Sequence, residues 1–249
     1  MKAAAQLYTV RDRLQDASDV TTVLGRLREI GYAAVEVAGL GSEVSARFGD
    51  LLEASELRAC AAHVGLESLM KDLAEVASRC QAWGCRYIVV PSLPAAYHSR
   101  PGVERFAQKA ATIAAGLDAF GLELAYHNHA FELEPWDDRT RLEAIYDSIP
   151  PAVLKAELDT YWLAYADSDP AGWIRRLAGR VPLVHLKDMT TREGRRAPAE
   201  LGEGDLDWPV ILDACRDAGT QWLVVEQDES LRDPLDSLAA SYAYLAAHI

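Results

Sequence analysis

Ionisable side chains follow several runs of β-forming residues in the second half of the chain. The stretch AYHNHAFELEP, residues 125–135, holds two of the six histidines, His127 and His129, on either side of one asparagine. The later runs VLKAELD, PLVHLKD and WLVVEQD contribute further polar groups, namely Asp159, His185, Lys187 and Glu226. Imidazole nitrogens and carboxylate oxygens together suit Mn²⁺, Co²⁺, Fe²⁺ or Zn²⁺. These residue types therefore predict a divalent-cation site.

The alternation of side chains along a strand indicates whether these groups share a face. In LELAYHNH the leucines and the tyrosine fall on one face, which leaves His127 and His129 on the other. The same alternation in the later runs gives one polar face to Glu157, Asp159, His185, Lys187 and Glu226. Taken singly, the groups also suit structural roles, such as a helix cap at Asp159 or a buried salt bridge at Glu226. Taken together, uncompensated charges would be costly to bury, which favours a bound cation.

A glycine separates a helix-like stretch from a β-rich run at five places in the chain, namely Gly31, Gly84, Gly121, Gly179 and Gly219. Glycine just past a helix adopts the left-handed cap conformation without steric cost, so each one marks a helix end. The helices are amphipathic, since a stretch such as residues 103–117 repeats apolar residues three or four apart. This order of helix, glycine and strand predicts repeated βα units.

Eight runs qualify as strands, near residues 3–8, 34–38, 57–63, 86–91, 122–128, 153–159, 181–187 and 222–227. Their alternation with helices is typical of an α/β protein folded as a single (β/α)8 TIM barrel domain, residues 1–249. A doubly wound open sheet is the alternative, but YTVRDRL after the first run lacks a glycine-rich dinucleotide loop. Residues 190–208 are expected to form a long loop over one barrel mouth. Active sites of such barrels lie at the carboxyl ends of the strands, where the polar groups fall.

The excess of acidic over basic residues argues against polyanionic partners. The chain has 25 Lys and Arg against 38 Asp and Glu, a formal net charge of −13, and such a surface repels nucleic-acid phosphates and anionic lipid. We therefore expect neither a nucleic-acid nor a membrane partner. The start of the chain lacks the apolar core of a signal peptide, which favours a cytoplasmic protein. The four cysteines form no CxxC pair and are expected to be structural thiols.

Longer motifs carry a family resemblance. YHNHAFELEP, ELDTYWLAYADSDPAGWIRRLAGRVPLVHLKD, LGEGDLDW and VVEQD resemble the xylose isomerase-like TIM barrel family of sugar phosphate isomerases and epimerases, which also includes inosose dehydratases and tagatose-type epimerases. The likeness covers essentially the whole chain, including QLYTVRD and GYAAVEVAG. It implies one divalent cation, Mn²⁺ first with Co²⁺, Zn²⁺, Fe²⁺ or Mg²⁺ as alternatives. By motif, its ligands are His127, Asp159, His185 and Glu226.

The chain departs from the family pattern at residues 127–129, because many relatives have Glu-Asn-His where this chain has His-Asn-His. In epimerases of that type, glutamates from the fifth and eighth strands bind metal and move protons on opposite faces of the substrate. His127 therefore argues against a symmetric two-carboxylate mechanism. Glu132 either folds back as a ligand or base, or is a loop carboxylate. Glu36 and His63, near the ends of the second and third strands, either hydrogen-bond a polyol or are structural.

The resemblance implies a metal-dependent isomerase or epimerase that enolises a keto or aldo sugar, or a sugar phosphate. Glu226 is the expected base. The proton returns from His129 or from Glu132. Lys187 beside His185 would stabilise the developing oxyanion.

Other interpretations stay open. One is a metal-dependent dehydratase or lyase that acts on an inosose or 3-keto sugar, and another is a non-catalytic sugar-binding barrel. Trp162 and Trp208 fall in expected loops at the same mouth, where aromatic faces suit sugar rings, although such residues also pack as lids. The partner expected is a small carbohydrate, and the likeness also implies a homodimer or homotetramer.

Overall fold

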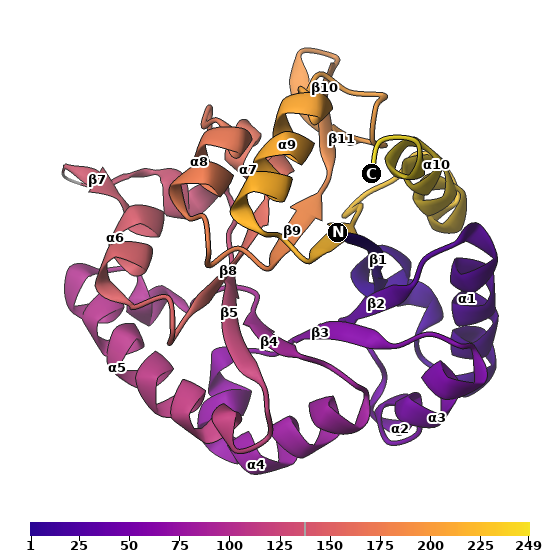
Figure 1. The fold of residues 1–249 in the computed structure, drawn as a ribbon, viewed down its shortest axis with the longest axis horizontal. Helices are drawn as coiled ribbons and strands as arrows, with labels where there is room; N and C mark the ends of the chain where they lie inside the picture. Colours follow the sequence, from indigo (N-terminus) through magenta and orange to yellow (C-terminus); the bar gives the residue numbers. More distant parts are fainter. Residues whose placement is uncertain (137) are drawn as a thin grey trace.

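A computed structural model describes residues 1–136 and 138–249. Within these residues eight parallel strands close into a barrel in the order β1-β12-β9-β8-β5-β4-β3-β2, with helices around it (Figure 1). The barrel strands are β1 Lys2–Gln6, β2 Ala34–Val37, β3 Ala59–His63, β4 Tyr87–Val90, β5 Glu123–His127, β8 Lys155–Asp159, β9 Leu183–Leu186 and β12 Trp222–Val225. The predicted (β/α)8 barrel is therefore confirmed.

Helices follow the strands and cover the outside of the barrel (Figure 1). The α-helices are α1 Ala17–Ile30, α2 Ser42–Ser45, α3 Phe48–Ala54, α4 Leu66–Ala82, α5 Arg100–Asp118, α6 Arg141–Ser148, α7 Thr160–Tyr165, α8 Pro170–Arg176, α9 Trp208–Ala218 and α10 Pro234–Ala246. The 3-10 helices are η1 Leu7–Arg13, η2 Ala95–Tyr97 and η3 Ala130–Leu133. Gly31 and Gly219, predicted to end helices, cap α1 and α9 with φ of 118° and 77°.

Two apolar layers lie on opposite faces of the barrel strands. Small and aromatic side chains fill the interior, namely Ala4, Ala34, Cys60, Ala61, Tyr87, Val89, Ala125, Leu183, Trp222 and Val224. Alternate residues such as Leu124, Tyr126 and Leu158 belong to the larger core beneath the helices. His127 follows Ala125 by two positions and so points into the barrel. The predicted inward face of the strand ends is confirmed.

The expectation of one long loop over residues 190–208 is wrong in its first half. Residues there form an antiparallel hairpin of β10 Asp188–Arg192 and β11 Arg195–Ala199. The two connecting residues, Glu193 and Gly194, have φ of 50° and 75°. Positive φ at both central residues is typical of the hairpin turn that matches strand twist, and Gly194 at the second of them was its available sequence signal. A second hairpin pairs β6 Pro135–Trp136 with β7 Arg139–Thr140.

The structure tests two further expectations, the state of the cysteines and the presence of membrane-spanning helices. The four cysteines are buried and free, as predicted, namely Cys60, Cys80, Cys85 and Cys215. Among the residues described, helices of the length and apolarity that a bilayer crossing needs are absent.

Candidate metal centre and active site

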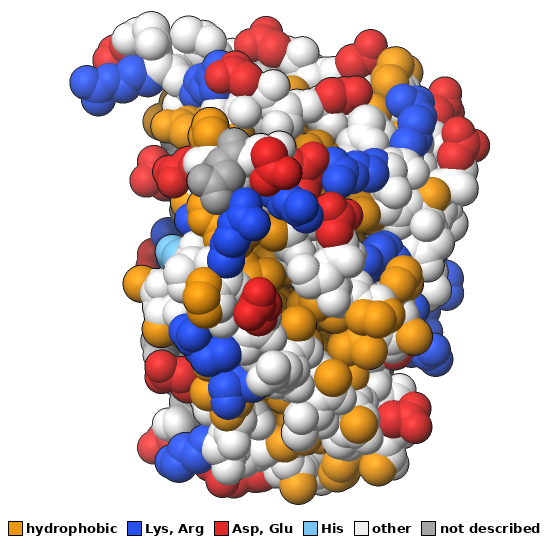
Figure 2. All heavy atoms as spheres, turned by 90° about the vertical axis from the view of Figure 1, so that its left-hand side faces the viewer, with side chains coloured by type: hydrophobic (Ala, Val, Ile, Leu, Met, Phe, Trp, Pro, Cys, Tyr) orange, Lys and Arg blue, Asp and Glu red, His pale blue; other side chains and the backbone are white. Residues whose placement is uncertain are grey.

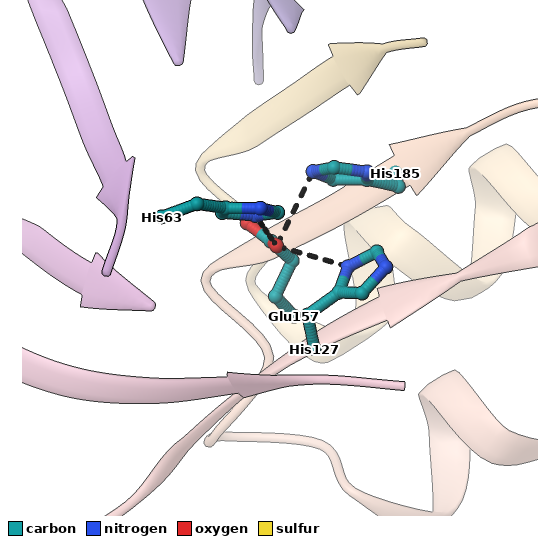
Figure 3. Close-up of side chains that lie close together, drawn as sticks. All are labelled: His63, His127, Glu157 and His185. Atoms are coloured by element: carbon teal, nitrogen blue, oxygen red, sulfur yellow. Dashed lines mark hydrogen bonds and ion pairs between the residues drawn. The ribbon is translucent and has the colours of Figure 1, made fainter. Parts of the chain in front are cut away.

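Glu157 of β8 lies fully buried in the barrel and gathers three imidazoles around one carboxylate oxygen (Figure 3). Its Oε2 is 2.8 Å from His63 Nε2, 3.1 Å from His127 Nδ1 and 3.2 Å from His185 Nε2. The ring centroids lie 4.6 to 5.5 Å apart. Each of these four residues offers a ligand atom within 4.8 Å of the others. We call them the deep cluster.

Glu36 of β2 adjoins the deep cluster. Its Oε2 lies 2.6 Å from His185 Nε2 and 3.5 Å from His63 Nε2, and it accepts a hydrogen bond of 2.8 Å from Gln6. Glu36 and Glu157 are both fully buried, and the Oε1 atom of each lacks a hydrogen-bond partner among the described residues. Buried carboxylates are costly without compensation, so the donor chemistry and these unpartnered oxygens fit a divalent cation.

The pKa values of Glu36 and Glu157 are shifted in opposite directions. Burial, with the neighbouring Glu157 adding to it, raises the pKa of Glu36 to about 7. Burial acts on Glu157 in the same sense, but the imidazoles of His185 and His63 outweigh it and hold its pKa well below the usual range. Glu157 is therefore ionised at neutral pH, which is the form that binds a metal.

The residues predicted as ligands from the sequence meet at the outer ends of the strands. His185 Nδ1 is 3.1 Å from Glu226 Oε2 and 3.9 Å from Asp159 Oδ2, and these three residues form a second group of potential ligands. His127 adjoins the group, with its Nε2 atom 4.0 Å from Asp159 Oδ2. We call these four residues the strand-end set. The structure brings them together, and His127 and His185 belong to both groups.

The Lys187 ammonium lies among the carboxylates of the strand-end set. Its Nζ is 3.2 Å from Asp159 Oδ2, 3.0 Å from Glu226 Oε2 and 2.5 Å from Asp228 Oδ2. Burial lowers the pKa of Lys187, but these carboxylates outweigh it and raise that pKa well above the usual range. Burial alone would raise the pKa of Glu226, yet Lys187 and His185 hold it well below normal. Glu226 and Lys187 are therefore an ionised pair.

An aromatic rim surrounds this ammonium. Lys187 Nζ is 5.4 Å from the ring centroid of Tyr161 and 5.3 Å from that of Trp162. His129 stands one pleat further out than His127, with its ring 5.4 Å from Trp162. Burial, aided by the charge of Lys187, lowers the pKa of His129 to about 4. His129 is therefore a neutral imidazole at neutral pH.

Glu132 and Trp208 have their polar atoms engaged by neighbouring groups. Glu132 Oε1 accepts a 2.5 Å hydrogen bond from the Tyr126 hydroxyl, and its Oε2 accepts one of 2.8 Å from the His129 backbone N–H. Trp208 is 2% exposed, and its indole N–H donates to Asp188 Oδ2 at 2.6 Å. We propose that both residues hold the loops at the barrel mouth in place and do not contact substrate.

The LGEGDLDW motif wraps around Asp188, the residue after Lys187. The backbone N–H groups of Gly202 and Gly204 donate to its Oδ2 at 3.0 and 3.1 Å. A Cβ atom on Gly204 would lie 2.3 Å from Asp188 Oδ1 and 2.5 Å from the Met189 carbonyl oxygen, so this approach requires glycine. The motif thereby fixes the chain at the position where Lys187 enters the site.

Sequence reasoning gave no role to Glu157, Asp228 or Gln6. Parity placed Glu157 on the polar face of its strand, and Asp228 lies two residues beyond Glu226 on the same face. These were the available signals. Gln6 ends β1 among alanines, and its contact with Glu36 depends on the pairing of β1 with β2.

Comparison with known proteins agrees with this fold. The chain is similar to an inosose dehydratase of Geobacillus kaustophilus, with 24% identity over 97% of this chain and 91% of that protein. The rhizopine catabolism protein MocC of Rhizobium meliloti is also 24% identical, over 88% and 77%. A sugar phosphate isomerase/epimerase structure from Parabacteroides distasonis superposes with a TM-score of 0.84 at 18% identity, covering 99% of this chain and 98% of that one. Residues 24–248 match the family model, and the chain therefore belongs to the xylose isomerase-like TIM barrel family.

Proposed function

We propose that this protein is a divalent-metal-dependent enzyme that enolises a keto or aldo sugar, or a sugar phosphate, and yields an isomer or epimer. The observation that carries the proposal is the convergence of buried imidazoles and carboxylates on His185, beside the Lys187 ammonium. His185 belongs to both ligand groups, so the cation would lie against this residue in either one. Family membership, with an inosose dehydratase and a sugar phosphate isomerase/epimerase among similar proteins, supports the reaction class.

An enolisation needs a base for the carbon-bound proton and a donor for the developing oxyanion, and Glu226 and Lys187 at the barrel mouth suit these two roles. A bound divalent cation would polarise a carbonyl and a neighbouring hydroxyl, and so acidify the carbon-bound proton between them. Glu226, ionised beside Lys187 and His185, accepts that proton on a carboxylate oxygen. Lys187 donates a hydrogen bond to the substrate oxygen that gains negative charge.

The position of the returning proton decides the product. Once its carboxyl proton has exchanged with solvent, Glu226 can deliver a proton to the adjacent carbon on the same face, which gives an isomer. His129 is neutral at neutral pH, so it accepts a proton from a substrate hydroxyl more readily than it supplies one. The site thus offers one carboxylate base and one neutral imidazole on the rim.

A dehydratase or lyase acting on an inosose or 3-keto sugar is the second candidate. The strand-five position holds His127 in place of a second carboxylate base, and the similar curated proteins are an inosose dehydratase and a rhizopine catabolism protein. Proton abstraction by Glu226 would be the same first step. Departure of the β-hydroxyl, which leaves as water after taking that proton, would then give an unsaturated product.

Incubation in heavy water separates these reactions. The metal-loaded protein is mixed with a panel of keto sugars, sugar phosphates and inososes, and the products are analysed by NMR and mass spectrometry. An isomeric sugar that retains solvent deuterium supports the isomerase or epimerase, whereas an unsaturated product supports the dehydratase. Glu226→Gln should abolish either reaction, with the exposed Glu229→Gln as the matched control. Sugar binding that is unchanged by a chelator, without deuterium exchange, would indicate a binding protein instead.

A further inference from the structure

We infer that Glu157 and Glu36 are positioning residues, which accept the second N–H of His127 and His185 beneath a cation in the strand-end set. Each histidine then presents its other nitrogen, with its lone pair, to the cation. The inference rests on the proposed function, because it concerns the cation that this function requires. It adds the two groups that decide which nitrogen of each ring faces that cation.

The two nitrogens of His127 face two different carboxylates of β8. Nδ1 lies 3.1 Å from Glu157 Oε2, and Nε2 lies 4.0 Å from Asp159 Oδ2 at the strand end. Asp159 Oδ2 is buried without a hydrogen-bond partner among the described residues, although the Lys187 ammonium lies 3.2 Å away. A neutral imidazole carries a proton on one nitrogen and a lone pair on the other. A proton on Nδ1 toward Glu157 therefore leaves the lone pair of Nε2 directed at the strand-end set.

His185 shows the same division with its nitrogens exchanged. Its Nε2 lies 2.6 Å from Glu36 Oε2 and 3.2 Å from Glu157 Oε2. Its Nδ1 lies 3.1 Å from Glu226 Oε2 and 3.9 Å from Asp159 Oδ2. A metal-bound histidine almost always donates its second N–H to a carboxylate, carbonyl or water, which fixes the ring and its tautomer. A proton on Nε2 toward Glu36 leaves Nδ1 of His185 for the cation.

Neighbours on other strands hold the two carboxylates in place. Gln6 of β1 donates a hydrogen bond of 2.8 Å to Glu36 Oε2. His63 of β3 places its Nε2 2.8 Å from Glu157 Oε2, on the opposite side of the barrel interior (Figure 3). Glu36 and Glu157 are both fully buried. They therefore act on the histidine rings and do not contact substrate.

The pair of His127 and Glu157 gives the departure from the family's Glu-Asn-His pattern a physical reason. A glutamate at position 127 would bring its negative charge directly to the cation, whereas a neutral imidazole brings none. Glu157 supplies that charge through the bond from His127 Nδ1, which also makes the imidazole a stronger ligand. The carboxylate is thus moved out of the coordination sphere and kept within the site.

The nitrogen through which each histidine binds the cation tests the inference in the unaltered protein. The protein is labelled with ¹⁵N in its histidines, stripped with a chelator and loaded with Zn²⁺. Two-bond proton–nitrogen NMR then identifies the metal-bound nitrogen of each ring. We expect His127 to bind through Nε2 and His185 through Nδ1, each with a proton on its other nitrogen. Binding through His127 Nδ1 or His185 Nε2 would overturn the inference and leave the proposed function intact, whereas absence of Zn²⁺ from both rings would overturn both.

Variants of the two carboxylates measure what these bonds contribute to metal binding. Glu157→Gln and Glu36→Gln remove the negative charge at nearly constant size, and each should weaken Zn²⁺ binding about ten- to a hundredfold in calorimetric titrations of stripped protein. Glu200→Gln is the matched control, since Glu200 is also buried and bonds the Ser237 hydroxyl away from the histidines. Circular dichroism checks that the variants are folded. Unchanged Zn²⁺ affinity in a folded variant would overturn the role of that carboxylate, and the NMR measurement decides if the variants fail to fold.

A substitution of His127 separates positioning from a general effect of charge. In His127→Glu the ligand is itself a carboxylate and has no N–H for Glu157 to accept. The loss of Zn²⁺ affinity caused by Glu157→Gln should therefore be at least several-fold smaller in this background than in the wild type. Equal losses in the two backgrounds would show that Glu157 acts through its charge alone and would overturn its positioning role.

Discussion

Glu157 Oε2 and His63 Nε2 lie 2.8 Å apart, although the two residues are 94 positions apart in the chain. Their strands, β8 and β3, are not neighbours in the sheet, since β5 and β4 lie between them. The side chains meet because the sheet closes on itself and directs both inward. A cation on the histidines that Glu157 contacts therefore binds only the closed barrel, and its binding energy adds to the stability of the fold.

Metal removal should lower the thermal stability of the protein. A ligand present at 100 times its Kd stabilises the folded state by about 2.7 kcal/mol. For a chain of this size that corresponds to about 5 to 10 °C in Tm. Calorimetric scans of the chelator-treated and Co²⁺-loaded protein measure the difference. Identical melting of stripped and loaded wild-type protein would contradict the prediction.

Loss of the Lys187 charge should destabilise the protein strongly. Lys187→Met leaves the carboxylates of Asp159 and Glu226 buried without their ammonium partner. Breaking one side of a buried ion pair typically costs about 3 to 5 kcal/mol. Lys155→Met is the control, because Lys155 pairs with the partly exposed Glu123 and such pairs contribute below about 1 kcal/mol. Urea denaturation of both variants measures the costs, and equal costs would refute this account of Lys187.

The barrel and the inward face of its strand ends were predictable because their signals are local. Gly31 and its counterparts mark helix ends within a few residues, and alternation assigns a face without knowledge of neighbours. Parity also placed Glu157 on the inward face. Its partners remained hidden, because nothing near residue 157 indicates that His63 lies opposite it.

The sequence also gave no signal for how deeply each loop tryptophan is buried. Trp162 and Trp208 both looked like loop aromatics, yet Trp208 is 2% exposed and bonded to Asp188, whereas Trp162 is only partly buried. The difference arises from the turn around Asp188, which brings Trp208 inward. That turn depends on backbone donors, which any sequence supplies, and on the absence of a Cβ atom at Gly204.

Glu143 should contribute stability that depends on pH. It accepts a 2.8 Å hydrogen bond from the Thr140 backbone N–H and pairs with Arg176, on the face that carries β7 and α6, where acidic and basic side chains lie side by side (Figure 2). The Thr140 bond first, and Arg176 next, lower the pKa of Glu143. Because the folded-state pKa lies below the unfolded value, the contribution is present above about pH 4.5 and is lost as the pH falls through the folded value.

Glu143→Gln keeps an acceptor for the helix cap and removes the charge. We expect a loss of about 0.5 to 1 kcal/mol at pH 7 that shrinks toward pH 3, measured by urea denaturation at both values. The exposed Glu67→Gln, in the first turn of α4, should show little change at either pH. A cost for Glu143→Gln that is independent of pH would show that the charge makes no contribution.

The two tryptophans should respond to truncation in opposite ways. Trp162 stands beside Lys187 and His129 on the rim, so Trp162→Ala should raise KM several-fold while the free energy of unfolding changes by less than about 1 kcal/mol. Trp208 fills a buried site, so Trp208→Ala should cost about 3 to 5 kcal/mol of stability. Sugar binding by the folded fraction of that variant should change little. Weakened binding in Trp208→Ala, with none in Trp162→Ala, would show that the substrate lies against the LGEGDLDW turn and not against the aromatic rim.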